Sequence, residues 1–190
     1  MVFKGWATLG LAALGFMPHN LKRRIGRGDL HFITFTCYQR RRLLDSVRAR
    51  NLAVKTLGEV RERFGIALLG YVIMPEHVHV LINEVPAIPP AKVIQVFKQR
   101  VARQMRGKKG RDAKQRSLEF PAAEAALRRF WQRRYYDFNV YTEKKLREKL
   151  DYIHINPVRE KLVQHSRDWP WSSWTFYERG EGLLAMDKWK

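Results

Sequence analysis

Two histidines occupy alternate positions in the apolar segment HVHVLIN, residues 77–83. Successive side chains of a β-strand point to opposite faces, so His77 and His79 share one face. Val78 and Val80 are then directed into the core. The two imidazoles stand about 7 Å apart along the strand and can converge on one metal ion. The alternative is a pair of surface histidines on a half-exposed sheet.

A second candidate group lies on a helix that we expect to begin at Thr142, a good N-cap residue. The polar residues within about 60° of one another on this helix are Lys145, Lys149, Tyr152 and Asn156. A separate apolar stripe consists of Leu146, Leu150 and Ile153. We expect this stripe to dock on the sheet, so that the polar stripe borders the packed face. The alternative is an amphipathic helix whose tyrosine packs at the core margin.

Strand and helix patterns alternate along the chain. β-Branched and aromatic residues predict strands at 30–38, 66–74 and 77–83, and a fourth within 127–141. Helical spacing predicts helices at about 46–64, 91–106 and 142–155. The last should stop before Pro157, which biases the preceding residue away from the helical conformation. This order predicts an α+β fold, a ferredoxin-like βαββαβ antiparallel sheet with an appended C-terminal helix.

The first sixteen residues differ from the rest of the chain. An uncharged apolar run at 6–17 is too short to span a bilayer. It has the length of a signal-peptide core, but no small-residue cleavage site stands out after it. We expect translation to begin at Met17, which makes 1–16 a non-native or mis-started extension and 17–190 a single domain.

The chain carries 37 Lys and Arg against 18 Asp and Glu, a formal net charge of +19. An excess of that size indicates a polyanionic partner, first of all nucleic acid. Ten basic residues fall within 92–116, and the Gly-, Lys- and Arg-rich stretch 107–119 is typical of an exposed loop. For any one of them the alternative is a solvated side chain. The candidate DNA contacts are Lys22, Arg23, Arg24, Arg27, Lys98, Arg103, Arg133, Lys145 and Lys149.

Two further compositional features limit the possibilities. Cys37 is the single cysteine, so no intrachain disulfide or cysteine-based zinc site can form, and the reducing cytoplasm is the natural compartment. Late aromatic residues either stack on bases or cover the core. These are Trp169, Trp171, Trp174 and Phe176.

Three segments resemble one protein family. MPEHVHVLI (74–82), FWQRRYYDFNVYTEKKLREKLDYIHINPVREKLV (130–163) and RDWPWSSW (167–174) are similar to the REP-associated tyrosine transposases. These are single-tyrosine members of the HUH endonuclease superfamily, related to transposases of small insertion sequences. The resemblance covers essentially residues 17–177 and implies one HUH transposase-like domain over 17–190.

The resemblance assigns roles to the two candidate groups. It implies that Tyr152, on the appended helix, attacks the scissile phosphate, and that Asn156 completes a metal site with His77 and His79. Because Mg²⁺ favours oxygen ligands and histidine suits Mn²⁺, either ion should be accepted. His154 is a weaker ligand candidate, since it lies on the wrong side of the helix. Rival nucleophiles outside the motif are Tyr135, Tyr136 and Tyr141.

The resemblance also implies a substrate and a product. The substrate would be single-stranded hairpin DNA of a palindromic repeat, with the basic segment 20–28 as a candidate reader of a guide sequence. Cleavage would leave a 5′-phosphotyrosine link and a free 3′-hydroxyl. We expect a bacterial protein of the cytoplasm, associated with the nucleoid and not with a membrane, that acts as a monomer.

Two other functions remain open. One is a non-catalytic binder of single-stranded nucleic acid on a ferredoxin-like sheet, although such binders carry aromatic residues on their central strands, where this chain has histidines. The other is a metal-dependent hydrolase without a covalent step. It would need further ligands, for which the neighbouring sequence offers Glu76 and Glu84.

Overall fold

The elements follow one another in the predicted order. A computed structural model describes residues 25–106 and 129–189, so the predictions for 1–16, 107–119 and the three basic residues at 22–24 lie outside the described residues. The strands are β1 (Leu30–Thr36), β2 (Leu68–Ile73), β3 (His77–Asn83) and β4 (Tyr136–Val140). The long helices are α1 (Val47–Phe64), α2 (Pro90–Arg106) and α5 (Glu143–Arg159). Shorter helices are η1 (Tyr38–Arg40), η3 (Ser166–Asp168) and α6 (Trp174–Arg179).

The four strands form one antiparallel sheet in the order β2-β3-β1-β4. This is the strand order of the ferredoxin-like βαββαβ fold, and the predicted fold class is confirmed. The histidine strand β3 is therefore central, and β4 is an edge strand beside β1.

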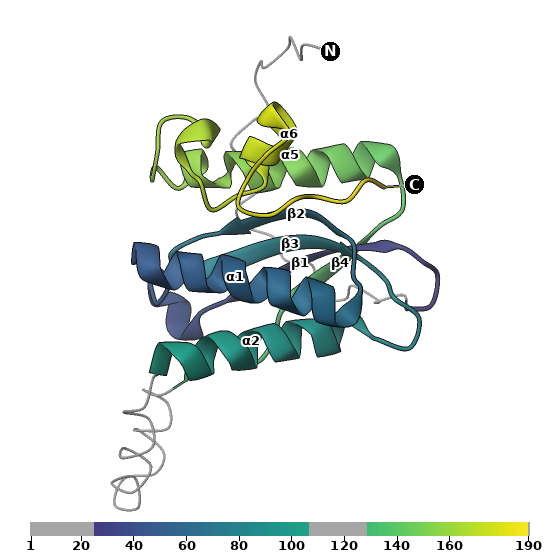
Figure 1. The fold of residues 1–190 in the computed structure, drawn as a ribbon, viewed down its shortest axis with the longest axis horizontal. Coiled ribbons are helices and arrows are strands. Elements are labelled where there is room, and N and C mark those ends of the chain that lie inside the picture. Colours follow the sequence, from purple (N-terminus) through teal and green to yellow (C-terminus); the bar gives the residue numbers. More distant parts are fainter. Residues whose placement is uncertain (1–24, 107–128, 190) are drawn as a thin grey trace, which may run out of the picture.

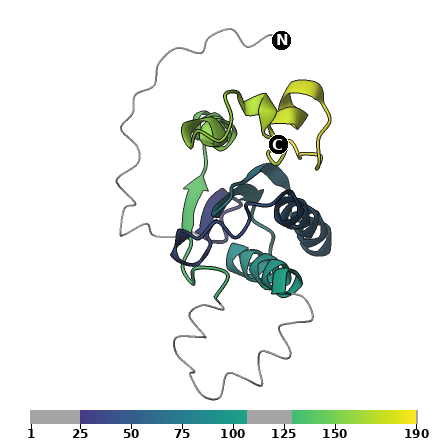
Figure 2. The same ribbon diagram turned by 90° about the vertical axis from the view of Figure 1, so that its left-hand side faces the viewer.

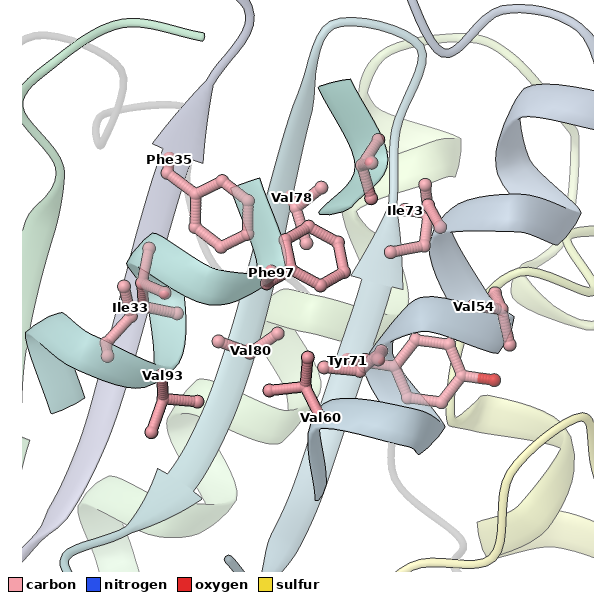
Figure 3. Close-up of a cluster of buried hydrophobic side chains, with 14 of the residues drawn as sticks. Ile33, Phe35, Val54, Val60, Tyr71, Ile73, Val78, Val80, Val93 and Phe97 are labelled. Atoms are coloured by element: carbon pink, nitrogen blue, oxygen red, sulfur yellow. The ribbon is translucent and has the colours of Figure 1, made fainter. Parts of the chain in front are cut away.

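Helices cover both faces of the sheet. Figures 1 and 2 show α1 and α2 on one side and α5 with α6 on the other. The core beneath α1 and α2 includes Val78 and Val80, both fully buried as predicted (Figure 3). No helix in the described part of the chain is long and apolar enough to cross a membrane.

Local sequence signals account for where the helices begin and end. The Ser46 side chain accepts a hydrogen bond from the Ala49 amide at the start of α1. Gly65 ends α1 in the left-handed conformation, with φ of 59°, which glycine adopts without steric cost. The Thr142 side chain accepts a hydrogen bond from the Lys145 amide and begins α5 as predicted.

The predicted end of the last helix is wrong. Helix α5 continues through Pro157 to Arg159. A proline inside a helix removes one backbone hydrogen bond. Here the loss falls in the final turns, where Ile153, Asn156 and Pro157 are buried. Packing of this end against the sheet therefore outweighs the local preference.

The apolar stripe of α5 docks as expected, mainly on β2 and β3. Leu146 and Ile153 are buried there, and Leu150 packs beside them. The close approach depends on Gly70 in β2, because a Cβ atom at this position would lie 2.6 Å from Cδ2 of Leu150. This packing holds the helix beside the histidine strand.

Three of the late aromatic residues, Trp169, Trp171 and Phe176, belong to or pack against the core, and base stacking by the group stays a prediction. Trp169 is buried and its indole N–H donates to the Ile73 carbonyl at 3.1 Å. The Trp171 indole donates to Oδ1 of Asn51 at 2.7 Å, and the Arg50 guanidinium lies 4.0 Å from its ring centroid. Trp174 in α6 is half-buried, and Phe176 packs against the core beneath α1.

Candidate metal and nucleophile site

The two histidines of β3 lie under α5. His79 pairs in register with Thr34 on β1 and with Val72 on β2, which places it in the middle of the sheet. His77 and His79 are 6% and 3% exposed, so neither is a surface histidine. Their ring centroids are 4.7 Å apart. The strand alternation therefore brings both imidazoles to one face, as the sequence predicted.

His79 is held at both ring nitrogens. Nδ1 lies 2.7 Å from Oγ1 of Thr34, and Nε2 lies 3.2 Å from Nδ2 of Asn156. Burial lowers the pKa of His79 well below its ordinary value, and the nearby His77 and Lys149 lower it further. A neutral ring donates through one nitrogen only. Because the Asn156 amide donates to Nε2, Nδ1 carries the proton and donates to Thr34.

The side-chain oxygen of Asn156 is buried and unsatisfied among the described residues. The residue is 4% exposed, and within the described residues its Oδ1 is buried without a hydrogen-bond partner. Leaving such an acceptor unpaired costs about 1–3 kcal/mol. A cation bound at Nε2 of His79 would take the place of the Asn156 N–H, and a half-turn of the amide would present Oδ1 to it, so the residues present fit a metal ion.

A carboxylate orients the other histidine. Nδ1 of His77 lies 2.9 Å from Oε1 of Glu76, which also accepts from Nη2 of Arg40 at 3.3 Å. Burial by itself would raise the pKa of Glu76, but the contacts with His77 and Arg40 outweigh it and leave the pKa below its ordinary value. A carboxylate that holds one imidazole nitrogen directs the other toward a ligand.

The ligand set is sparse. In the described ranges, no group of three or more His, Cys, Asp or Glu side chains is placed to hold a metal ion. An ion at this site would depend on His77, His79 and the amide oxygen of Asn156, with water or substrate oxygens completing its shell. Glu84, offered by the sequence for a hydrolase, instead accepts hydrogen bonds from the backbone amides of Gly26, Arg27 and Gly28.

Tyr152 lies against the histidines. Its half-buried ring has its centroid 5.2 Å from that of His79 and 5.8 Å from that of Phe32, edge to face in both cases. The guanidinium of Arg159 lies 5.3 Å from the Tyr152 centroid. Helix α5 thus brings Tyr152 and Asn156 together on His79, although their chemical roles stay predictions.

The other candidates of the motif lie elsewhere. Nε2 of His154 is 2.9 Å from Oγ of Ser173, away from the histidine pair, and burial lowers its pKa to about 4. Tyr135 packs against the core beneath α1 and α2, and Tyr141 is 65% exposed. Tyr136 is the one rival that shares the face of Tyr152, because it pairs with Thr34.

The predicted DNA contacts are dispersed. Lys149 lies at the site, with Nζ 5.1 Å from the Phe32 centroid, while Lys145 pairs with Glu148 at 2.7 Å. Lys98 is on α2 under the opposite face, where its ammonium donates to the Gln132 carbonyl and burial lowers its pKa to about 8. The exposed candidates are Arg27, Arg103 and Arg133. DNA binding by each of these residues stays a prediction.

Sequence reasoning did not find three residues of the site. Thr34 and Phe32 were unremarkable members of a strand, and Arg159 stood beyond the expected end of its helix. Alternation along β1 places Thr34 and Phe32 on one face, but no local signal indicates that β1 pairs with β3 and shares this face with His79.

The chain matches the model of a known protein family over more than half of its length. Residues 27–156 match the family described as "Transposase IS200 like", and the chain is a member of that family. The matched range contains both histidines, Tyr152 and Asn156. Membership makes the protein a single-strand DNA transposase or endonuclease by class.

Similar proteins confirm the resemblance to REP-associated tyrosine transposases. One is named "Putative REP-associated tyrosine transposase" in Haemophilus influenzae and is 28% identical over 158 residues, 81% of this chain and 84% of that protein. The REP-associated tyrosine transposase of Escherichia coli K12 is 37% identical over 62 residues, 32% of this chain and 36% of that protein. A solved REP-associated tyrosine transposase bound to a REP hairpin superposes with a TM-score of 0.64 at 20% identity, covering 91% of this chain and 94% of that one, and supports the fold.

Proposed function

We propose that this protein cleaves and rejoins single-stranded hairpin DNA of the REP type, with Tyr152 as the nucleophile and a divalent ion at His77, His79 and Asn156. The observation that carries the proposal is the contact of α5 with β3, in which Asn156 touches His79 and Tyr152 packs on the same ring. Two similar proteins are named as REP-associated, which supports REP DNA as the substrate, and one solved relative is bound to a REP hairpin, which supports the hairpin form.

The covalent step exchanges one phosphate ester for another. The phenolic oxygen of Tyr152 bonds to the scissile phosphorus and loses its proton, while the bond from phosphorus to the 3′ oxygen breaks and that oxygen gains a proton. The products are a 5′-phosphotyrosine and a 3′-hydroxyl, and attack by a 3′-hydroxyl reverses the step. No nucleotide triphosphate is needed, because the ester is conserved in the link.

Protein groups prepare this step. His77, His79 and Asn156 would hold Mg²⁺ or Mn²⁺, which would draw charge from the scissile phosphate. Thr34 holds His79 in the tautomer whose Nε2 lone pair faces Asn156. Arg159 is positioned over the Tyr152 ring, where its charge would favour an incoming phosphate.

Covalent capture tests the proposal. Protein, Mn²⁺ or Mg²⁺ and a labelled genomic hairpin are mixed and run on a denaturing gel. We expect a protein–DNA adduct that disappears in Tyr152→Phe and His79→Ala and persists in Tyr136→Phe and Tyr141→Phe. An adduct in Tyr152→Phe would refute the nucleophile. Cleavage without an adduct would indicate a hydrolase, and binding of several hairpins without cleavage a non-catalytic binder.

We further propose that the protein acts as a monomer at the bacterial nucleoid in the cytoplasm, where chromosomal repeats are found. Helix α5 packs on its own sheet, and the amides of Ser173 and Ile73 bond across the β2 edge to Tyr71 and Trp171. Mixing His79→Ala with Tyr152→Phe should therefore not restore the adduct. Restoration would mean that two chains share each site.

A further inference from the structure

We infer that Tyr136 and Lys149 form a subsite for the nucleotide next to the scissile phosphate, in which Tyr136 stacks on the base and Lys149 contacts the adjoining phosphate. This inference rests on the proposed function, because Tyr152 marks where the scissile phosphate lies. It gives Tyr136 a part in binding in place of the nucleophilic part considered from the sequence.

The sheet register places Tyr136 beside the site. Thr34 on β1 pairs with His79 on one side and with Tyr136 on the other, so the three residues form one row across the sheet. Residues paired in one row point to the same face. With neighbouring strands about 4.8 Å apart, Tyr136 stands roughly 10 Å from His79 along this row. Tyr136 is therefore two strands away from the metal-ligand candidate His79, on the same face of the sheet.

The β4 side of this face is less covered than the β2 side. Helix α5 packs mainly on β2 and β3, and β4 is the edge strand. Phe32 is 3% exposed, whereas Tyr136 and Phe138 on β4 are both half-buried. The Tyr136 ring meets Phe32 edge to face, with centroids 6.4 Å apart and an interplanar angle of 72°. Phe32 thus packs against the Tyr136 ring, while part of the Tyr136 side chain remains exposed to solvent.

The ammonium group of Lys149 lies near the rings of Phe32 and Phe138. Nζ of Lys149 is 4.9 Å from the centroid of Phe138 and 5.1 Å from that of Phe32. Its nearest carboxylate oxygen, on Glu148, is 3.8 Å away, and Glu148 is also bonded to Lys145 at 2.7 Å. Burial lowers the pKa of Lys149. An anionic ligand at this position would supply the counter-charge that its aromatic neighbours do not.

The chemistry of the two residues selects a single strand. Exposed aromatic rings beside a cation are the usual means of binding single-stranded nucleic acid, because each base offers a face for stacking and each linkage a charge. Bases within a duplex are already stacked on one another. The subsite should therefore take an unpaired nucleotide at the foot of a hairpin.

A DNA-binding assay under conditions that prevent cleavage tests this subsite separately from catalysis. The affinity for a fluorescein-labelled oligothymidylate is measured by anisotropy in EDTA, with Tyr152→Phe as the parent. We expect Tyr136→Leu to weaken binding about tenfold and Tyr136→Phe to change it less than about twofold, because phenylalanine keeps the ring. Phe64→Leu is the matched control, since Phe64 is also a half-buried aromatic residue near a cation, Arg63 at 5.5 Å, but lies on α1 across the sheet.

Equal affinities of Tyr136→Leu and its parent would overturn the subsite, as would an equal loss in Phe64→Leu. A loss of affinity in Tyr136→Phe would show that the hydroxyl acts rather than the ring. If Tyr136→Leu does not fold, 2-aminopurine in the oligonucleotide replaces it as the test. We expect the parent and Tyr136→Phe to quench its fluorescence at one position, and no quenching at any position would contradict stacking.

Salt dependence tests the lysine. Removing one cation that pairs with a phosphate of a single strand reduces the slope of log K against log salt by about 0.7. We expect that reduction in Lys149→Gln and none in Lys55→Gln, an exposed lysine on α1. An unchanged slope in Lys149→Gln would remove Lys149 from the subsite. These assays need neither metal nor Tyr152, so they can fail while the adduct test succeeds, and the reverse.

Discussion

The hydroxyl oxygen of Thr34 lies 2.7 Å from Nδ1 of His79, across the central pair of strands. His79 donates its Nδ1 proton in this bond, so the lone pair lies on Nε2, which accepts from the Asn156 amide. Partners of this kind determine how well a histidine binds a metal, and their removal typically costs 10- to 100-fold in affinity.

Replacing Thr34 should therefore weaken metal binding while the fold is kept. We expect Thr34→Val to bind Mn²⁺ about tenfold or more weakly, and Thr34→Ser to bind it nearly as the parent does, by calorimetric titration of metal-free protein. Thr56→Val is the control, because Thr56 is buried on α1 without a side-chain hydrogen-bond partner among the described residues. An unchanged affinity in Thr34→Val would rule out this role for Thr34.

Metal should stabilise the protein through Asn156. A ligand at 100 times its Kd adds about 2.7 kcal/mol to the free energy of unfolding, which for a chain of this size raises Tm by roughly 5–10 °C. We expect Mn²⁺ to produce this shift in the parent and not in Asn156→Leu, measured by thermal unfolding with and without EDTA. His154→Gln should keep the shift, since His154 faces Ser173. An equal shift in Asn156→Leu would place the ion elsewhere.

Stability should fall in acid because of His154. Burial lowers its folded pKa to about 4, below the ordinary value of 6.5, so the unfolded chain binds the proton more readily. The contribution of the neutral ring is complete above pH 6.5 and is lost as the pH falls toward 4. Between pH 7 and pH 5 the loss is about 2 kcal/mol.

Urea unfolding at the two pH values measures this loss. The decrease in unfolding free energy from pH 7 to pH 5 should be smaller in His154→Gln than in the parent by about 2 kcal/mol. His79 has a lowered pKa and contributes in the same direction, whereas the raised pKa of His31 contributes in the opposite one. Both contributions are common to the two proteins and cancel in the comparison. Identical decreases would show that His154 does not titrate in this range.

Gly70 controls how closely α5 approaches the sheet. A methyl group at this position would meet Leu150 at 2.6 Å and Ile153 at 3.3 Å, so Gly70→Ala should destabilise the protein by about 1–3 kcal/mol and reduce adduct formation. Adding Leu150→Ala should recover part of the stability and part of the adduct formation, because it removes the side-chain atoms nearest to the new methyl group. Thermal unfolding and the gel assay measure the two effects. Additive losses in the double variant would contradict the proposed clash.

The sequence by itself determined much of the frame. Alternation in HVHVLIN put the histidines on one face and the valines in the core, and it required only local geometry. Thr142 marked the start of a helix because capping involves the adjacent backbone. The pattern of elements then allowed few topologies, of which the ferredoxin-like one is observed.

Tertiary structure alone decided how the site is assembled. The contact of Asn156 with His79 joins residues 77 apart in the chain, and that of Thr34 with His79 joins residues 45 apart. Lys98 has the charge of a DNA contact, yet the fold turns its ammonium to the Gln132 carbonyl. Packing against the sheet likewise lets α5 continue through Pro157 to Arg159. Such outcomes depend on which surfaces meet and how closely they pack, which spacing along the chain does not contain.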